Sequence, residues 1–263
     1  MKRINAIETG KEQMPSISII IAAYNEETKI AQTLETVIAI FDKKKEKYGN
    51  YEIILVDDGS TDKTSEEANI VSKKYPQVKV VSSMPNKGKG FAIRKGMNEA
   101  KGDIFLLTDA DLAYALNNVD PFLDACSLYD VAVGTRIHPE STYLMNYTSF
   151  KLIFFRHIIS RFFNALVDFF FGIKQTDKQC GLKVMKKEIG KIIVSHGKIN
   201  GFSYDVELFL IAKNRGSKII ELPVQVKYSD TDSKVRVWKH APKMFLELLT
   251  IKYNQLKGVY GRK

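Results

Sequence analysis

The chain has 263 residues, 44% hydrophobic and 27% charged, an ordinary composition for a folded protein with a sizeable core. This length suits one large α/β domain or two small ones. Lys and Arg number 40 against 30 Asp and Glu, so the formal net charge is +10. That excess favours an anionic partner, which can be nucleic acid, a phosphorylated metabolite or an acidic lipid surface. The two cysteines, Cys126 and Cys180, form no CxxC motif, which argues against a disulfide framework and for a reducing compartment.

Residues 1–14 are polar and contain no apolar core of a secretory signal, so we expect a flexible tail there. No segment is an uninterrupted apolar run of about eighteen residues, so a conventional membrane span is not expected. The segment 152–173 comes nearest, because it is mostly apolar. Its polar residues recur at steps of three and four and predict one polar stripe on a helix: His157, Ser160, Arg161, Asn164 and Asp168.

The first half of the chain alternates between predicted strands and helices. Short runs rich in Ile, Leu and Val predict buried strands, and apolar residues at steps of three and four predict helices between them. The predicted strands cover 16–23, 51–56, 78–82 and 103–108, and the predicted helices cover 26–48 and 89–100. A further helix is expected after 57–62, with Ser60 or Thr61 as its cap. This alternation indicates right-handed crossovers and a largely parallel sheet.

The second half has a looser pattern that mixes short strands and helices. Helices are predicted over 119–125, 202–214 and 238–256, strands over 130–134 and 181–185, and a strand pair broken at Pro223 over 218–228. The chain contains no internal repeat and no low-complexity linker, so we expect a single domain over 15–263. Its first part, 15–115, carries the acidic motifs.

Two carboxylates, Asp109 and Asp111, follow the predicted strand 103–108 in the stretch LLTDADL. Ligands bind beyond the carboxyl ends of strands in open parallel sheets. Like charges this close repel each other unless a cation lies between them, so the pair predicts a site for a divalent metal on a diphosphate. The competing interpretation is a solvated turn, because acidic doublets are common in loops.

Two further motifs follow the preceding strands. Asp57 is a candidate ligand for a ribose hydroxyl or a base N–H, whereas Asp58 and Ser60 are equally well explained as caps of the next helix. The stretch Asn86–Gly90 combines glycines, two lysines and a helix start, which predicts an anion cradle. It lacks the GxxxxGK[ST] spacing, so a P-loop ATPase is disfavoured.

Taken together and in this order, AAYNEE, LVDDGSTDKT, NKGKGFAIRKG and TDADL resemble the nucleotide-sugar half of a family 2 glycosyltransferase. The later stretches VGTR, TDKQCGLK, SYDVEL and SKV resemble its polyprenyl-phosphate branch, most closely the dolichyl-phosphate β-glucosyltransferases. The resemblance implies an α/β GT-A fold with a mainly parallel central sheet flanked by helices. It further implies a nucleotide-sugar half over 15–115, and an acceptor and membrane-interface half over 116–263 with interfacial amphipathic helices.

The resemblance also implies roles for individual residues. Asp109 and Asp111 are the expected ligands of Mg²⁺ or Mn²⁺. Relatives in the mannosyltransferase branch carry a Gln two residues later, where this chain has Ala113, so water and phosphate complete the metal site or the site is weaker. Asp205 orients the acceptor or the sugar, unless it is only a charge in the first turn of a helix. The positions implied to bind donor or phosphate are Ala22, Tyr24, Glu26, Asp57, Lys89, Ala110, Arg136, Lys234 and Arg236.

The implied reaction is inverting transfer of a hexose, with glucose from UDP-glucose favoured, to a polyprenyl or dolichyl phosphate at a membrane surface. That acceptor phosphate is mostly ionised at neutral pH, so no strong general base is required. The segments 150–173 and 237–258 are the expected membrane contacts, and the expected location is peripheral, on the cytoplasmic membrane face. A buried core or dimer helix is the competing interpretation of 150–173.

Several alternatives stay open at this point. In the first alternative, the donor is GDP-mannose or another UDP-sugar. In the second alternative, the acceptor is a polysaccharide or a protein. A nucleotidyltransferase is disfavoured because no triphosphate signature is present. A basic membrane-binding protein without enzymatic activity is a third possibility; nucleic acid is not an expected partner, and homo-oligomerisation is left open.

Overall fold

A computed structural model describes residues 14–144, 161, 163–227 and 237–261. Lys234, Arg236, nearly all of the expected tail, and residues 150–160 and 162 of the segment 150–173 lie outside the described residues. The later helix α9, Val237–Leu256, contains Pro242. No helix within the described ranges is both long and apolar enough to cross a membrane.

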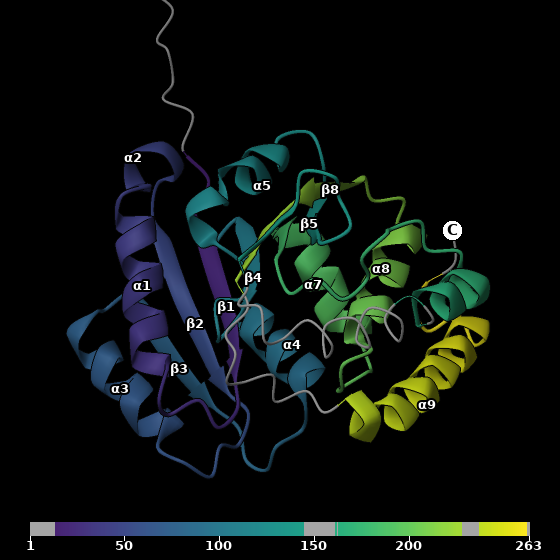
Figure 1. Cartoon of the computed structure of the whole chain (residues 1–263), viewed down its shortest axis with the longest axis horizontal. Coiled ribbons are helices and arrows are strands. Elements are labelled where there is room, and N and C mark those ends of the chain that lie inside the picture. Colours follow the sequence, from purple (N-terminus) through teal and green to yellow (C-terminus); the bar gives the residue numbers. More distant parts are fainter. Residues whose placement is uncertain (1–13, 145–160, 162, 228–236, 262–263) are drawn as a thin grey trace, which may run out of the picture.

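Seven strands within the described residues form one sheet in the order β3-β2-β1-β4-β7-β5-β8 (Figure 1). Their bounds are β1 Ile17–Ala23, β2 Tyr51–Asp57, β3 Val78–Ser82, β4 Ile104–Asp109, β5 Val131–Thr135, β7 Lys183–Lys186 and β8 Ile219–Pro223. The four neighbouring strands β3, β2, β1 and β4 are parallel to one another, and β7 runs antiparallel to both β4 and β5. The mainly parallel sheet predicted from the sequence is therefore confirmed.

A second, small sheet pairs β6 with β9, whose bounds are Thr142–Leu144 and Gln225–Lys227. The expected strand pair around Pro223 is wrong as a pair, because β8 joins the large sheet and β9 joins the small one. Pro223 ends β8 and cannot donate a ladder hydrogen bond, which is consistent with the chain leaving the large sheet there.

The helices alternate with the strands in the first half and cluster in the second. They are α1 Ile30–Asp42, α2 Lys45–Tyr48, α3 Thr64–Lys74, α4 Lys89–Glu99, a 3₁₀ turn Leu116–Asn118, α5 Asp120–Ala125, α7 Lys187–His196 and α8 Tyr204–Asn214. A helix also covers 163–171. The predicted helix 26–48 is split into α1 and α2, and α7 was not predicted. Figure 1 shows α1 and α3 at one end of the molecule and α9 at the other.

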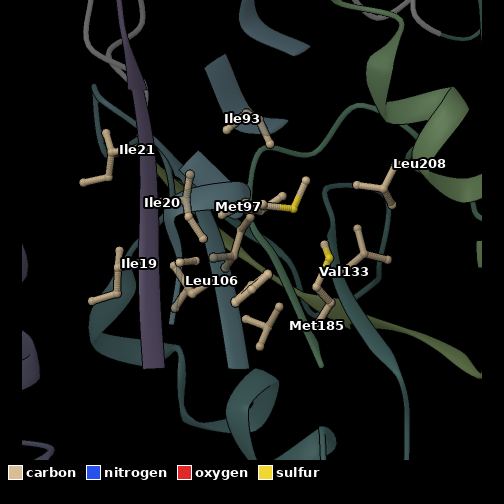
Figure 2. Packing of buried hydrophobic residues seen from close by; sticks show 14 of the residues in the cluster. Ile19, Ile20, Ile21, Ile93, Met97, Leu106, Val133, Met185 and Leu208 are labelled. Carbon is tan, nitrogen blue, oxygen red and sulfur yellow. The ribbon is translucent and has the colours of Figure 1, made fainter. Parts of the chain in front are cut away.

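The core lies on both faces of the central strands. Ile19, Ile20 and Ile21 of β1 are all fully buried, which explains why this strand is continuously apolar and not alternating. Figure 2 shows Ile93 and Met97 of α4 packed close to β1. Gly96 permits this approach, because a Cβ there would lie 2.4 Å from Cγ2 of Ile20. The strand ends that carry the acidic motifs are thus anchored in a rigid core.

Candidate active site

The carboxyl ends of β1, β2 and β4 are in register. Ala22 pairs with Asp109 of β4, and Ala23 pairs with Asp57 of β2. Parallel neighbours in register bring their ends to one edge of the sheet. The expectation that the residues after these strands meet in one place is therefore confirmed.

The Asp109–Asp111 corner is a tight turn fastened to α1. The N–H of Leu112 donates to the carbonyl of Asp109 at 3.1 Å, and Leu112 adopts a positive φ of 46°. The Thr33 hydroxyl of α1 donates to the carbonyl of Ala110 at 2.7 Å, and Ala110 is buried. One oxygen of Asp111 accepts the N–H of Ala113 at 3.0 Å. The two carboxylates are thus carried on a fixed backbone.

Lys89, the first residue of α4, places its ammonium 2.5 Å from Oδ1 of Asp109. Burial alone would raise the pKa of Asp109, but the charge and hydrogen bond of Lys89, together with the charges of Lys183 and Arg136, lower it. Burial alone would lower the pKa of Lys89, but the surrounding carboxylates, Asp109 first among them, together raise it. Loss of hydration, followed by the charge of Asp109, raises the pKa of Asp111. Asp109 is therefore a firm anion, and Asp111 is the carboxylate that would gain most from an added cation.

Asp205 lies in the first turn of α8 and is buried against Lys183. The Lys183 ammonium is 2.7 Å from Oδ1 of Asp205. Asp205 is thus both a charge at a helix start and a member of a buried ion pair. Lys183 received no role from the sequence, although a lysine in the middle of the predicted strand 181–185 is itself a signal of a buried counter-charge.

Arg136 follows β5 and is held by Asp177. Its Nε and Nη2 donate to the two carboxylate oxygens of Asp177 at 2.6 and 2.8 Å, and its backbone N–H donates at 3.1 Å. Burial alone would raise the pKa of Asp177, but these donors keep it below its usual value. Arg136 was expected as a cation for phosphate, and the structure shows it as a structural partner of Asp177.

The predicted nucleoside residues lie on two loops that fasten each other. The N–H of Asn25 donates to Oγ of Ser60 at 2.9 Å, and the N–H of Glu26 donates to Oγ1 of Thr64 at 2.7 Å. Oδ1 of Asp57 accepts the N–H of Ser60 at 3.0 Å, while the Tyr24 side chain is exposed. The expected cap by Ser60 or Thr61 is wrong. Lys63 precedes α3 without a side-chain cap, since Ser60 bonds the other loop.

The predicted anion cradle at Asn86–Gly90 is filled by the chain's own carboxylate. The N–H groups of Lys87 and Gly88 donate to Asp58 at 3.0 and 2.6 Å, and the N–H of Phe91 donates to the carbonyl of Asn200 at 3.2 Å. Asp58 therefore caps this loop and not α3, and burial raises its pKa. The cradle prediction is corrected: these amides are already used, and Lys89 is what the motif contributes to the site.

The donor set fits a divalent cation that is shared with a substrate. No group of three or more His, Cys, Asp or Glu side chains within the described part of the chain could hold a metal by itself. Asp109 and Asp111 are two hard oxygen ligands, and their mutual repulsion is what a divalent cation relieves. Mg²⁺ in particular is commonly bound by one or two carboxylates together with substrate phosphates.

Solved structures with a similar fold are glycosyltransferases of the GT-A type. One is glucosyl-3-phosphoglycerate synthase from Mycobacterium tuberculosis in complex with UDP, with a TM-score of 0.62 and 20% identity over 90% of this chain and 80% of that chain. Another complex of that enzyme contains Mn²⁺, UDP-glucose and phosphoglyceric acid (TM-score 0.61, 19% identity, the same coverage). A mannosyltransferase from Pyrobaculum calidifontis with GDP-mannose and Mn²⁺ has a TM-score of 0.56 and 18% identity over 91% and 65% of the two chains.

Sequence comparison gives the family. The profile described as Glycosyl transferase family 2 matches residues 18–191. Dolichyl-phosphate β-glucosyltransferase of Saccharomyces cerevisiae is 31% identical over 93% of this chain and 76% of its own length. The human enzyme of the same name is 29% identical over 95% and 81%. With its fold and its ordered acidic corner, the chain therefore belongs to glycosyl transferase family 2 and is a glycosyltransferase of the GT-A fold.

Proposed function

We propose that the chain transfers glucose from UDP-glucose to dolichyl phosphate, or a related polyprenyl phosphate, with inversion at C1. The observation that carries this proposal is the 31% identity to the yeast dolichyl-phosphate β-glucosyltransferase along nearly the whole chain. The site geometry supports it. Asp109 and Lys89 form an ion pair at the end of β4. Arg136 is paired with Asp177, and Asp205 is paired with Lys183.

Asp109 and Asp111 would hold Mg²⁺ or Mn²⁺ on the donor diphosphate. A bound divalent cation supplies charge neutralisation for the departing nucleoside diphosphate. The solved neighbours with Mn²⁺ support a divalent metal in this proposal. Ala113 offers no side-chain ligand, so the remaining coordination positions belong to phosphate and water.

The residues of the chain position the two phosphates and hold the charge of the site. Lys89 stays protonated beside Asp109 and adds a fixed positive charge where the diphosphate leaves. Arg136 would contribute its guanidinium charge to a second phosphate, and the two hydrogen bonds to Asp177 hold that guanidinium in place. The acceptor phosphate carries its own negative charge near pH 7, so it attacks C1 without a proton-accepting residue.

The helix at 163–171 and α9 are the proposed membrane contacts. Asn164 donates to the carbonyl of Thr176, and Asp168 pairs with Lys178, so these two members of the expected polar stripe contact the rest of the protein. Arg161 is exposed, and His157 and Ser160 lie outside the described residues. The Phe169 side chain, in contrast, is 84% exposed, although Val167 and Phe171 are buried. A helix that uses polar groups to dock and exposes an aromatic ring is suited to an apolar interface.

Helix α9 exposes an apolar stripe and contacts the helix at 163–171. The exposed apolar residues of α9 include Leu246, Leu249, Tyr253 and Leu256, at steps of three and four. The Lys252 ammonium donates to the carbonyl of Phe170 at 2.9 Å, which joins the two helices. We therefore propose peripheral attachment to the cytoplasmic face of a membrane, where the lipid-linked acceptor is available.

A donor and acceptor panel tests this function. The protein is incubated with UDP-glucose, GDP-mannose or another UDP-hexose, Mg²⁺ or Mn²⁺, and a short polyprenyl phosphate, and the lipid product is identified by mass spectrometry. We expect a hexosyl polyprenyl phosphate with UDP-glucose, and none from Asp109→Asn protein. Product only with GDP-mannose would change the donor, and no product with any donor would reject the transferase assignment to lipid phosphate.

A further inference from the structure

Lys183 is a fully buried cation at the start of β7, the antiparallel strand between β4 and β5. Its ammonium lies 2.7 Å from Oδ1 of Asp205 and donates to the carbonyl of Cys180. The rings of Tyr204 and Phe209 lie 5.9 Å from it. A charge so far from water is tolerated only when it is paired and hydrogen-bonded, so Asp205 is its counterion.

The Lys183–Asp205 ion pair lies close to the Asp109–Asp111 corner, the proposed metal site. Lys183 pairs in register with Leu107 of β4, two residues before Asp109. A Cβ on Gly181 would lie 2.1 Å from Oδ2 of Asp109, so the segment that leads into Lys183 touches that carboxylate. On the other side, a Cβ on Gly90 would lie 2.5 Å from Cβ of Tyr204, so the start of α8 touches α4 next to Lys89. A movement of Lys183 or Asp205 is therefore transmitted to the Asp109–Lys89 pair.

Two features favour a carboxylate at position 205. The first is the Lys183 ammonium, and the second is the place of Asp205 in the first turn of α8, where the helix dipole favours a negative charge. Loss of the Asp205 carboxylate would leave Lys183 buried without a counter-charge, which is strongly unfavourable. The ion pair therefore fixes the position of the Asp205 side chain.

Building on the proposed transferase function, we propose that Lys183 is a positioning residue for the reaction. It fixes the Asp205 carboxylate in the position from which that carboxylate orients a substrate hydroxyl. The acceptor phosphate needs no base, so the reaction is complete without proton transfer to Asp205. The Lys183–Asp205 pair then raises the rate by orienting the substrate, while Asp109 and Lys89 help to stabilise the charge of the leaving group.

Chemical rescue tests the charge of Lys183. Truncation in Lys183→Ala removes a group that n-propylammonium can replace, and n-propanol is the uncharged control. Lys178→Ala is the matched variant, since Lys178 is also buried, donates to the carbonyl of Gln175 at 2.6 Å and pairs with Asp168 at 2.9 Å. We expect kcat of Lys183→Ala to fall about 10²-fold with donor KM nearly unchanged, and propylammonium but not propanol to restore part of it.

A stability measurement covers the case in which no variant is active. Lys183→Met leaves Asp205 without its partner, whereas Lys183→Met with Asp205→Asn removes both charges. We expect the single variant to lower the Tm and the double variant to recover at least half of the loss.

Two results overturn the proposal: a Lys183→Ala protein no more impaired than Lys178→Ala and unresponsive to the amine, or a double variant that recovers no stability. If the wild-type protein transfers no sugar to lipid phosphate, the proposed function fails, and the thermal unfolding of the double variant still judges the ion pair.

Discussion

At the scale of single residues, three acids near the site are paired with a cation from another element. Asp109 of β4 pairs with Lys89 of α4, and Asp205 of α8 pairs with Lys183 of β7. Asp177 pairs with Arg136, which follows β5. Buried charges are stable only when paired, so each pair also fixes the relative position of two elements. Loss of hydration, followed by the charge of Asp109, raises the pKa of Asp111, and a divalent cation would relieve this repulsion.

Gly181 is the residue against which Asp109 is packed. A Cβ at this position would lie 2.1 Å from Oδ2 of Asp109, so Gly181→Ala must displace that carboxylate. We expect activity to fall about 10²-fold and the metal concentration for half-maximal activity to rise, as measured by initial rates against Mn²⁺ concentration. Gly258→Ala is the control, because open space surrounds Gly258. Its positive φ costs stability of about 1–2 kcal/mol without touching the site. Equal metal dependence in both variants would contradict this packing role.

The Arg136–Asp177 pair makes stability depend on pH. Because the folded pKa of Asp177 is depressed, its contribution is fully present above the unfolded value of about 3.9 and is lost as pH falls through the folded value. We expect Asp177→Asn to be clearly less stable than wild type at pH 7 and the difference to shrink below about pH 4. Urea unfolding between pH 7 and 3 measures this. The exposed Glu140→Gln is the control, and a constant difference across the range would refute the linkage.

At the scale of elements, the start of α4 shows how a motif can be occupied by the protein itself. Three N–H groups at this helix start, those of Lys87, Gly88 and Phe91, donate to Asp58 and to the carbonyl of Asn200. Gly88 allows this contact, since a Cβ there would lie 2.5 Å from that carbonyl and its φ is +107°. The loop before α4 therefore holds the end of β2 and the segment before α8 together, and it places Lys89 beside Asp109.

The exposed apolar residues of the two adjacent helices lead to a prediction about membranes. Phe169→Ser with Leu256→Ser removes side chains that are 84% and 68% exposed, so folding stability should hardly change. Burial of each side chain in lipid contributes about 1.5–3 kcal/mol, so the affinity for vesicles that contain phosphatidylserine should fall about tenfold or more per residue. Co-sedimentation with the vesicles measures this affinity.

The control for this prediction lies at the opposite part of the fold. Ile70→Ser with Leu128→Ser also removes two exposed apolar side chains, one from α3 and one after α5. We expect this variant to bind vesicles like the wild type. Equal binding by all three proteins, or no binding by the wild type, would contradict the interfacial assignment.

At the scale of the whole molecule, the site joins the ends of β1, β2 and β4 to α4, α8 and β7, so occupation of the site should stabilise the entire fold. A ligand at about 100 times its Kd adds roughly 2.7 kcal/mol. We expect UDP-glucose with Mn²⁺ to raise the Tm by roughly 5 °C, and UDP-glucose with EDTA to have little effect. Thermal unfolding measures this, and Asp109→Asn should lose the metal-dependent part. An equal shift with EDTA would argue against a metal between Asp109 and the diphosphate.

Much of the first half could be predicted because its signals are local. Continuous apolar runs predicted β1 to β4 to within a residue or two, and the polar residues directly after them predicted that Asp57 and Asp109 lie at the same edge of the sheet, on either side of β1. The resemblance in ordered motifs also gave the family correctly. The second half was harder, because β6 and β9 have only three residues each and their pairing joins segments far apart in the chain. The ten-residue α7 directly follows β7 and was missed.

By itself, the sequence determined the strand ends, the acidic corner at Asp109–Asp111 and the family, since each depends on residues that are close together in the chain. Only the tertiary structure decided which charge pairs with which. Lys183 and Asp205 are 22 positions apart, Arg136 and Asp177 are 41 apart, and Asp58 reaches Gly88 across 30. Such pairs form because burial removes water from both charges at once, and which elements are buried together depends on strand order and packing.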